Sequence, residues 1–151
     1  MDVLNVSDLR GTAGRILGVD FGDTRTGLAL SDPGRLLASG IGYVSPGGIE
    51  KTAASVASIA SDRGVSAIIV GLPRNMDGSE GPRAERCREF ASLLAAHLPH
   101  VAVAMIDERL TTVSATRYLN ATNTRGRSRK AVIDTLSAQI FLQNALDQLR
   151  G

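Results

Sequence analysis

The sequence predicts a single α/β domain, built on a mixed sheet with helices on both faces. Two patterns lead to this fold class. Three short apolar segments follow one another early in the chain, and the later apolar segments alternate with helical ones, as in parallel strands joined by crossover helices. A chain of 151 residues has the size of one domain. We therefore expect one domain over residues 15–151, preceded by a flexible leader over residues 1–14, which has no hydrophobic period.

The first three strands are predicted as an antiparallel meander. Residues 15–21, 25–31 and 36–44 are rich in apolar residues, and the turn sequences GDT and DPG separate them. Short apolar segments bounded by such turn residues are typical of strands joined by hairpins. The sequence SPGG then interrupts the chain, and we expect a helix to follow it.

The remaining elements are predicted to alternate. Apolar residues recur at helical spacing over residues 49–63, and Gly64 supplies a stop signal. The runs VSAIIVGL and VAVAMI predict two buried strands, with a helix over about residues 83–97 between them. The last third is predicted as two helices, at about residues 112–121 and 129–149, joined by the basic loop NTRGRS.

The composition excludes several classes of protein. Hydrophobic residues make up 43% of the chain and charged residues 21%, which is ordinary globular usage. The longest apolar runs are far shorter than the roughly twenty residues of a membrane-spanning helix, so we expect no membrane segment. The N-terminus does not resemble a secretory signal, and the single Cys87 excludes an internal disulfide framework. These features predict a cytoplasmic protein.

The basic residues point to a polyanionic partner. Fifteen of the 17 basic residues are arginine, whose planar side chain can bind one phosphate through two hydrogen bonds. From Arg109 to Ile133 there are six basic residues and no acid. Such a one-signed stretch predicts binding to nucleic-acid phosphates. An arginine-favouring genome and a solvated basic loop are the alternatives that composition leaves open.

Asp20 carries a charge within a segment that otherwise predicts a buried strand. An unpaired buried charge costs several kcal/mol, so this carboxylate requires a partner. The nearby Gly22 and Gly27 allow a tight turn and the close approach of a phosphate or of another backbone. A structural salt bridge to Arg25 is the alternative to a functional role.

Two other positions carry acids where burial is expected. Asp107 and Glu108 end the strand VAVAMI, and because adjacent strand residues point to opposite faces, only one of them can share a site with Asp20. Helix capping is the alternative for this pair. Asp134 falls within the apolar stripe of the final helix, and a different phase of that helix is the alternative there.

Together these acids predict a divalent-metal site. Three carboxylates in a partly dry pocket are the oxygen ligands that Mg²⁺ or Mn²⁺ prefers. The basic stretch between the last two acids would bring phosphates to the same place. The combination predicts metal-assisted hydrolysis of phosphodiester bonds. A non-catalytic RNA- or transcription-associated binding module is the alternative, although binding alone would not need acids at dry positions.

Four segments support a more specific interpretation. GVDFGDTRTGLALSD, VGLPRNMDGSEG, DERLTTVSA and AVIDTLSAQIFLQ resemble, in order and spacing, the YqgF family, also called RuvX, a bacterial branch of the ribonuclease H-like superfamily. The resemblance covers about residues 15–149. It implies a ribonuclease H-like fold with a five-stranded mixed sheet of order 3-2-1-4-5. It also implies catalytic, metal-binding acids at Asp20, Glu108 and Asp134, and thus selects Glu108 over Asp107.

The resemblance further implies a nuclease that processes the 5′ end of precursor 16S ribosomal RNA, with resolution of Holliday junctions as the older proposal for the family. A resolvase would favour a homodimer, whereas processing of one strand needs only a monomer. We expect the substrate to be bound by basic and amide side chains near the site: Arg25, Arg74, Asn75, Arg109, Arg125, Arg127, Arg129 and Lys130.

One competing resemblance starts from the same strand. The pattern DxGxTxxG that begins at Asp20 also resembles the first phosphate loop of actin-like and sugar-kinase ATPases. Those enzymes bind nucleotide between two lobes, and a chain of this length supplies one. Nucleotide binding would therefore require pairing of two chains.

Overall fold

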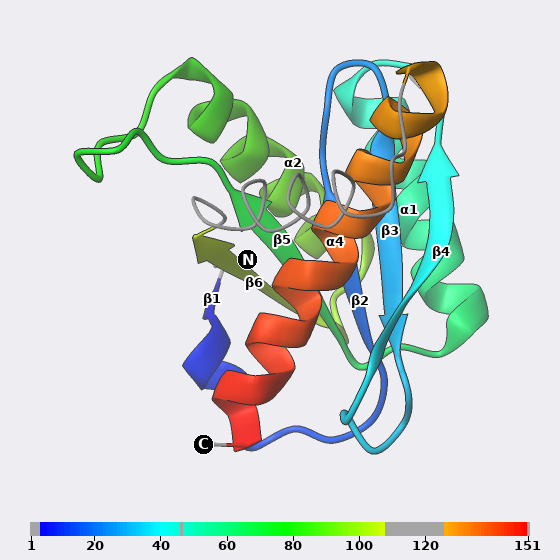
Figure 1. The fold of residues 1–151 in the computed structure, drawn as a ribbon. Helices are drawn as coiled ribbons and strands as arrows, with labels where there is room; N and C mark the ends of the chain where they lie inside the picture. Colours follow the sequence, from blue (N-terminus) through cyan, green and yellow to red (C-terminus); the bar gives the residue numbers. More distant parts are fainter. Residues whose placement is uncertain (1–3, 46, 108–125, 151) are drawn as a thin grey trace.

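The computed structural model describes residues 4–45, 47–107 and 126–150, and of residues 126–134 it describes the helical backbone alone (Figure 1). The described chain forms one six-stranded sheet of order β1-β6-β5-β2-β3-β4. The strands are β1 (Leu4–Asn5), β2 (Ile16–Asp20), β3 (Thr26–Ser31), β4 (Ala38–Val44), β5 (Ala67–Leu72) and β6 (Ala102–Asp107), and the helices are η1 (Val6–Leu9), α1 (Ile49–Arg63), α2 (Pro82–His97) and α4 (Gly126–Arg150).

The predicted topology is confirmed for five of these strands. β2, β3 and β4 pair antiparallel as a meander, and β5 and β6 extend the sheet in parallel on the other side of β2. Numbered without β1, their order is the expected 3-2-1-4-5. The predicted helix at residues 112–121 lies outside the described residues. The last helix begins at Gly126 rather than at residue 129.

The two faces of the sheet bury different helices. α1 and α2 cover one face and form a core with β2, β5 and β6 that includes Phe90 and Ile68. α4 crosses the other face, where Phe141 and Leu142 are fully buried. Figure 1 shows α4 in front of the sheet, with α1 and α2 behind it. The expected helices on both faces are therefore confirmed, and no helix of the described segments is long and apolar enough to cross a membrane.

The N-terminal segment differs from the expected flexible leader. Leu4–Asn5 form β1, a sixth strand that pairs in parallel with β6, and Val6–Leu9 form the short helix η1. Val6 and Leu9 are buried beside α4. The Arg35 side chain donates hydrogen bonds to the carbonyl oxygens of three residues in this segment: Leu9, Thr12 and Gly14. The expectation of a leader without regular structure is therefore wrong for Leu4–Leu9, because its apolar side chains complete the core under α4.

Gly18 lets α4 lie close to the sheet. A Cβ atom at this position would lie 2.9 Å from Leu142 Cβ and 3.1 Å from the carbonyl oxygen of Ala138. These distances are shorter than an ordinary contact between carbon atoms. The missing side chain in the middle of β2 therefore fixes how closely the last helix approaches the strand that carries Asp20.

Candidate active site

Asp20 is the last residue of β2 and lies at the carboxyl end of the central strands. It pairs with Gly27 of β3 and is half-buried. Strand residues two apart share a face, and Gly18 faces α4. The Asp20 side chain therefore points to the α4 face of the sheet, near its edge. This arrangement confirms the expectation of a carboxylate within an otherwise apolar strand.

The helix α4 brings its N-terminal half toward the same end of the sheet. Three side chains of α4 donate hydrogen bonds to β4 and to the residues just before it. Gln143 Nε2 donates to the Leu36 carbonyl, Gln139 Nε2 to the Ala38 carbonyl, and Thr135 Oγ1 to the Gly42 carbonyl. The helix thus runs antiparallel to β4, and β4 runs parallel to β2 because both pair antiparallel with β3. The start of α4 therefore lies at the same end of the sheet as the carboxyl end of β2.

The direction of α4 determines where the backbone of residue 134 lies. It lies one turn before Ala138, whose carbonyl oxygen is close to Gly18, so the helix backbone at 134 is displaced from Gly18 in the direction of Asp20. The side chain of Asp134 lies outside the described residues.

Asp107 does not share the site with Asp20. It ends β6 opposite Leu72 and is exposed. The preceding Ile106 packs into the α4 core, so alternation along the strand turns Asp107 to the opposite face. The structure thereby excludes Asp107 as the partner on the α4 face. Glu108, which the resemblance selects, lies outside the described residues.

The described part of the chain contains no group of three histidine, cysteine, aspartate or glutamate side chains that could hold a metal ion. Of the three expected metal ligands, Asp20 alone has a described side chain. Its half-buried carboxylate at a strand end fits a divalent cation that prefers oxygen ligands.

The expected substrate-binding residues are distributed differently. Arg25 lies in the turn after β2, with its guanidinium carbon 5.5 Å from the centre of the Tyr43 ring. Arg74 lies 3.7 Å from the Glu80 carboxylate, and Asn75 Nδ2 donates a hydrogen bond to Ser79 Oγ. Arg109 and Arg125 lie outside the described residues, as do the side chains of Arg127, Arg129 and Lys130.

The loop between β5 and α2 is held by an ion pair with α2. Arg88 of α2 donates two hydrogen bonds of 2.7 Å to the Glu80 carboxylate. The hydrogen bond from Arg88 holds the pKa of Glu80 below its usual value and raises the pKa of Arg88. The loop also carries Met76, 87% of whose surface is exposed. Figure 1 shows this loop extending away from the end of β5.

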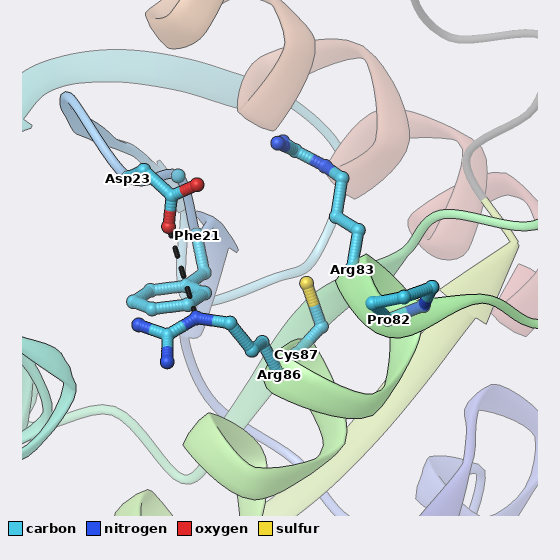
Figure 2. A pocket seen from close by; sticks show the side chains of 7 residues that line it. Phe21, Asp23, Pro82, Arg83, Arg86 and Cys87 are labelled. Carbon is cyan, nitrogen blue, oxygen red and sulfur yellow. Dashed lines mark ion pairs between the residues drawn. The ribbon is translucent and has the colours of Figure 1, made fainter.

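A pocket of about 210 Å³ adjoins the turn after Asp20. It is formed by that turn and by the start of α2, and its lining residues are Phe21, Gly22, Asp23, Pro82, Arg83, Arg86 and Cys87. Figure 2 shows Arg86 paired with Asp23, at 3.7 Å, and Arg83 extending from the first turn of the helix. Two arginines thus lie at the same end of the sheet as Asp20, beside the face that α1 and α2 cover.

Sequence reasoning missed Arg83 and Arg86. A basic side chain in the first turn of a helix is unfavourable with respect to the helix dipole. Because Arg83 directly follows Pro82, a residue that marks a helix start, this unfavourable placement was the signal that could have identified Arg83. Arg86 lies beyond the first turn, and the sequence carried no such signal for it.

Comparisons with known proteins agree with this geometry. The family model of RuvX, described as a Holliday junction resolvase, matches residues 14–148. A protein of Myxococcus xanthus is 45% identical over 136 residues, covering 90% of this chain and 89% of the relative, and one of Ruminiclostridium cellulolyticum is 39% identical over 138 residues, covering 91% and 96%. Both bear the name "Putative pre-16S rRNA nuclease".

Solved structures show the same fold. The T. thermophilus RuvC in complex with a Holliday junction substrate has a TM-score of 0.59 at 14% identity, covering 91% of this chain and 96% of RuvC. The fowlpox virus resolvase, in complex with Holliday junction DNA, has a TM-score of 0.53 at 10% identity, covering 87% and 98%. The fold is thus the ribonuclease H-like fold of the resolvases. Since the family model spans nearly the whole domain and the relatives match along almost their full length, the chain belongs to the RuvX family.

Proposed function

We propose that the protein is a metal-dependent endonuclease that hydrolyses phosphodiester bonds of structured nucleic acid, and that its role is the processing of the 5′ end of precursor 16S ribosomal RNA in the cytoplasm. The observation that carries this proposal is the position of Asp20, half-buried at the end of β2 and facing the helix that bears Asp134. Membership of the RuvX family and the names of its relatives support the reaction and the substrate.

The proposed ligands of Mg²⁺ or Mn²⁺ are Asp20, Glu108 and Asp134, which are also the proposed catalytic residues. Bound divalent metal would supply an activated water and stabilise the leaving oxygen. Asp20 contributes a carboxylate whose direction is fixed by the strand pairing with Gly27. Partial burial lowers the local dielectric, which strengthens the interaction of this carboxylate with a cation.

The proposed substrate contacts are arginine-rich. Arg25, Arg74 and Asn75 follow the carboxyl ends of β2 and β5, the edge at which the candidate site lies. Arg109, Arg125, Arg127, Arg129 and Lys130 belong to the basic stretch and would bind phosphates. We expect strongly salt-dependent binding, since each phosphate contact releases counterions.

Resolution of Holliday junctions is the second candidate, favoured by the description of the family model. It would require two symmetric cuts and hence two copies of the chain. Processing of one RNA strand needs only a monomer.

The decisive experiment compares cleavage of an end-labelled 16S precursor leader and of a four-way DNA junction, with Mg²⁺ or Mn²⁺ and after chelation. The variants are Asp20→Asn and, as a matched control, Asp107→Asn, because Asp107 ends another strand of the same parallel group, β6, but points to the opposite face. We expect metal-dependent cutting by the wild type and by the control, and none by Asp20→Asn. Cutting that survives in Asp20→Asn would refute the proposal, and the preferred substrate would decide between the two roles.

A further inference from the structure

We propose that Tyr43 and Arg25 form a platform for a nucleotide that adjoins the scissile phosphate, with the base stacked on the platform. The inference rests on the proposed nuclease function and names a binding site for its substrate strand.

Tyr43 lies in the same row of the sheet as Asp20. Asp20 pairs with Gly27, and Gly27 pairs with Tyr43 on the next strand. Paired residues on neighbouring strands point to the same face, and two strand spacings amount to about 10 Å. The carboxylate and the aromatic ring are therefore close neighbours on the α4 face, and Gly27 between them has no side chain to separate them.

An irregularity in β4 gives Tyr43 this direction. The pairing with β3 shifts by one residue between Leu28 and Ala29, where Gly42 and Gly40 are the partners. The extra residue, Ile41, reverses which later residues point to each face. Gly40 faces α4 through its contact with Thr135, so a regular strand would turn Tyr43 away from this face.

The chemistry of the pair suits an unpaired nucleotide. About half of the Tyr43 surface is exposed (49%), and the other large exposed apolar side chains among the described residues are aliphatic. The Arg25 guanidinium carbon lies 5.5 Å from the centre of the ring, within the range of a cation–π interaction. Bases stack on aromatic rings and on guanidinium planes, and the arginine charge attracts the phosphate.

The surface beyond Tyr43 can continue the path of the strand. β4 ends at Val44, and a pocket of about 310 Å³ opens there between the end of β4 and α1. Its lining includes one cation, Lys51, and the hydroxyl side chains of Ser45, Thr52 and Ser55. These groups lie on the α1 side of the sheet. Because β4 is an edge strand, a nucleic-acid strand held at Asp20 and Tyr43 would reach them by passing around this edge.

The absence of tryptophan from the chain allows a direct test. Tyr43→Trp places a single tryptophan on the platform, and Leu37→Trp places one at an exposed position (69%) near the opposite end of β4. Both are made in the Asp20→Asn background and titrated with the leader RNA and with the DNA junction, while anisotropy of the labelled nucleic acid reports binding. We expect quenching of the tryptophan at 43 and an unchanged signal at 37.

Removal of the ring gives the second readout. We expect Tyr43→Ala to weaken binding by about tenfold or more, to raise KM in the active enzyme and to change kcat little. Normal affinity of Tyr43→Ala, or binding without quenching at 43, would overturn the platform and leave the nuclease intact. Failure of the wild type to cut any nucleic acid would instead refute the function on which the inference rests.

Discussion

Gly18→Ala tests whether the distance between α4 and β2 controls activity. The added Cβ would lie 2.9 Å from Leu142 Cβ and 3.1 Å from the Ala138 carbonyl oxygen. Ordinary contacts between carbon atoms are about 3.5–4.0 Å, so the helix has to move away from the strand by roughly 0.6–1 Å. This displacement would act directly on the distance between the backbones that carry Asp20 and Asp134.

We expect Gly18→Ala to lower both the thermal stability and the catalytic rate. Overpacking of this size costs about 1–3 kcal/mol of the free energy of unfolding. With an unfolding entropy of about 2.1 cal/mol/K per residue, a chain of 151 residues loses roughly 3 °C in Tm for each kcal/mol. We therefore expect Tm to fall by about 3–9 °C. Misplacement of catalytic groups by about 1 Å can lower the rate by about a hundredfold, so kcat should fall by roughly ten- to a hundredfold.

The assay is metal-dependent cleavage of the labelled leader RNA at 25 °C, together with thermal unfolding of the same samples. Gly11→Ala is the matched control, because a Cβ there meets no atom within 4 Å, and it should retain the wild-type kcat and Tm. A Gly18→Ala protein with wild-type Tm would refute the packing argument. A lower Tm with unchanged kcat at 25 °C would refute the link between helix position and catalysis.

Two other predictions concern stability. Because hydrogen bonding from Arg88 lowers the pKa of Glu80 in the folded state, this pair stabilises the fold at pH values above the unfolded pKa of about 4.5 and the contribution disappears as the pH falls through the lower, folded pKa. The difference in Tm between wild type and Glu80→Gln should therefore be constant from pH 7 to about pH 5 and shrink as the pH falls below about 4.5. A difference that grows on acidification would contradict this sign. Arg35→Gln removes the hydrogen bonds to Leu9, Thr12 and Gly14. It should lower the free energy of unfolding by about 2 kcal/mol and speed up amide exchange in residues 4–9. Unchanged exchange there would show that Arg35 does not hold the segment.

The main strands and helices could be predicted from sequence because their signals are local. β5 is a continuous apolar run, and β2 and β6 are apolar up to their final aspartate. α1 ends before Gly64, which adopts the left-handed conformation that its stop signal predicts. β1 could not be predicted in this way. A strand of two residues has no period, and it exists because it pairs with β6, which is distant in the sequence.

The candidate site was predictable only where its signal is local in the sequence. Asp20 was identifiable because a charge within an apolar strand requires an explanation. The exclusion of Asp107 depended on knowing which face Ile106 occupies, and alternation alone left both Asp107 and Glu108 possible. The face to which Tyr43 points could not be predicted. It depends on one extra residue in β4, and the sequence alone does not show that β4 contains a bulge.

The short strand β1 also has a consequence for self-association. A sheet that ended at β6 would present a row of unpaired backbone groups on an apolar strand, which is a template for pairing with another chain. β1 occupies part of this edge, opposite Ala104 and Met105, and η1 covers the adjoining apolar surface with Val6 and Leu9. The segment thus protects the sheet edge from pairing with other chains. A chain shortened by its first nine residues should aggregate at concentrations at which the full chain does not.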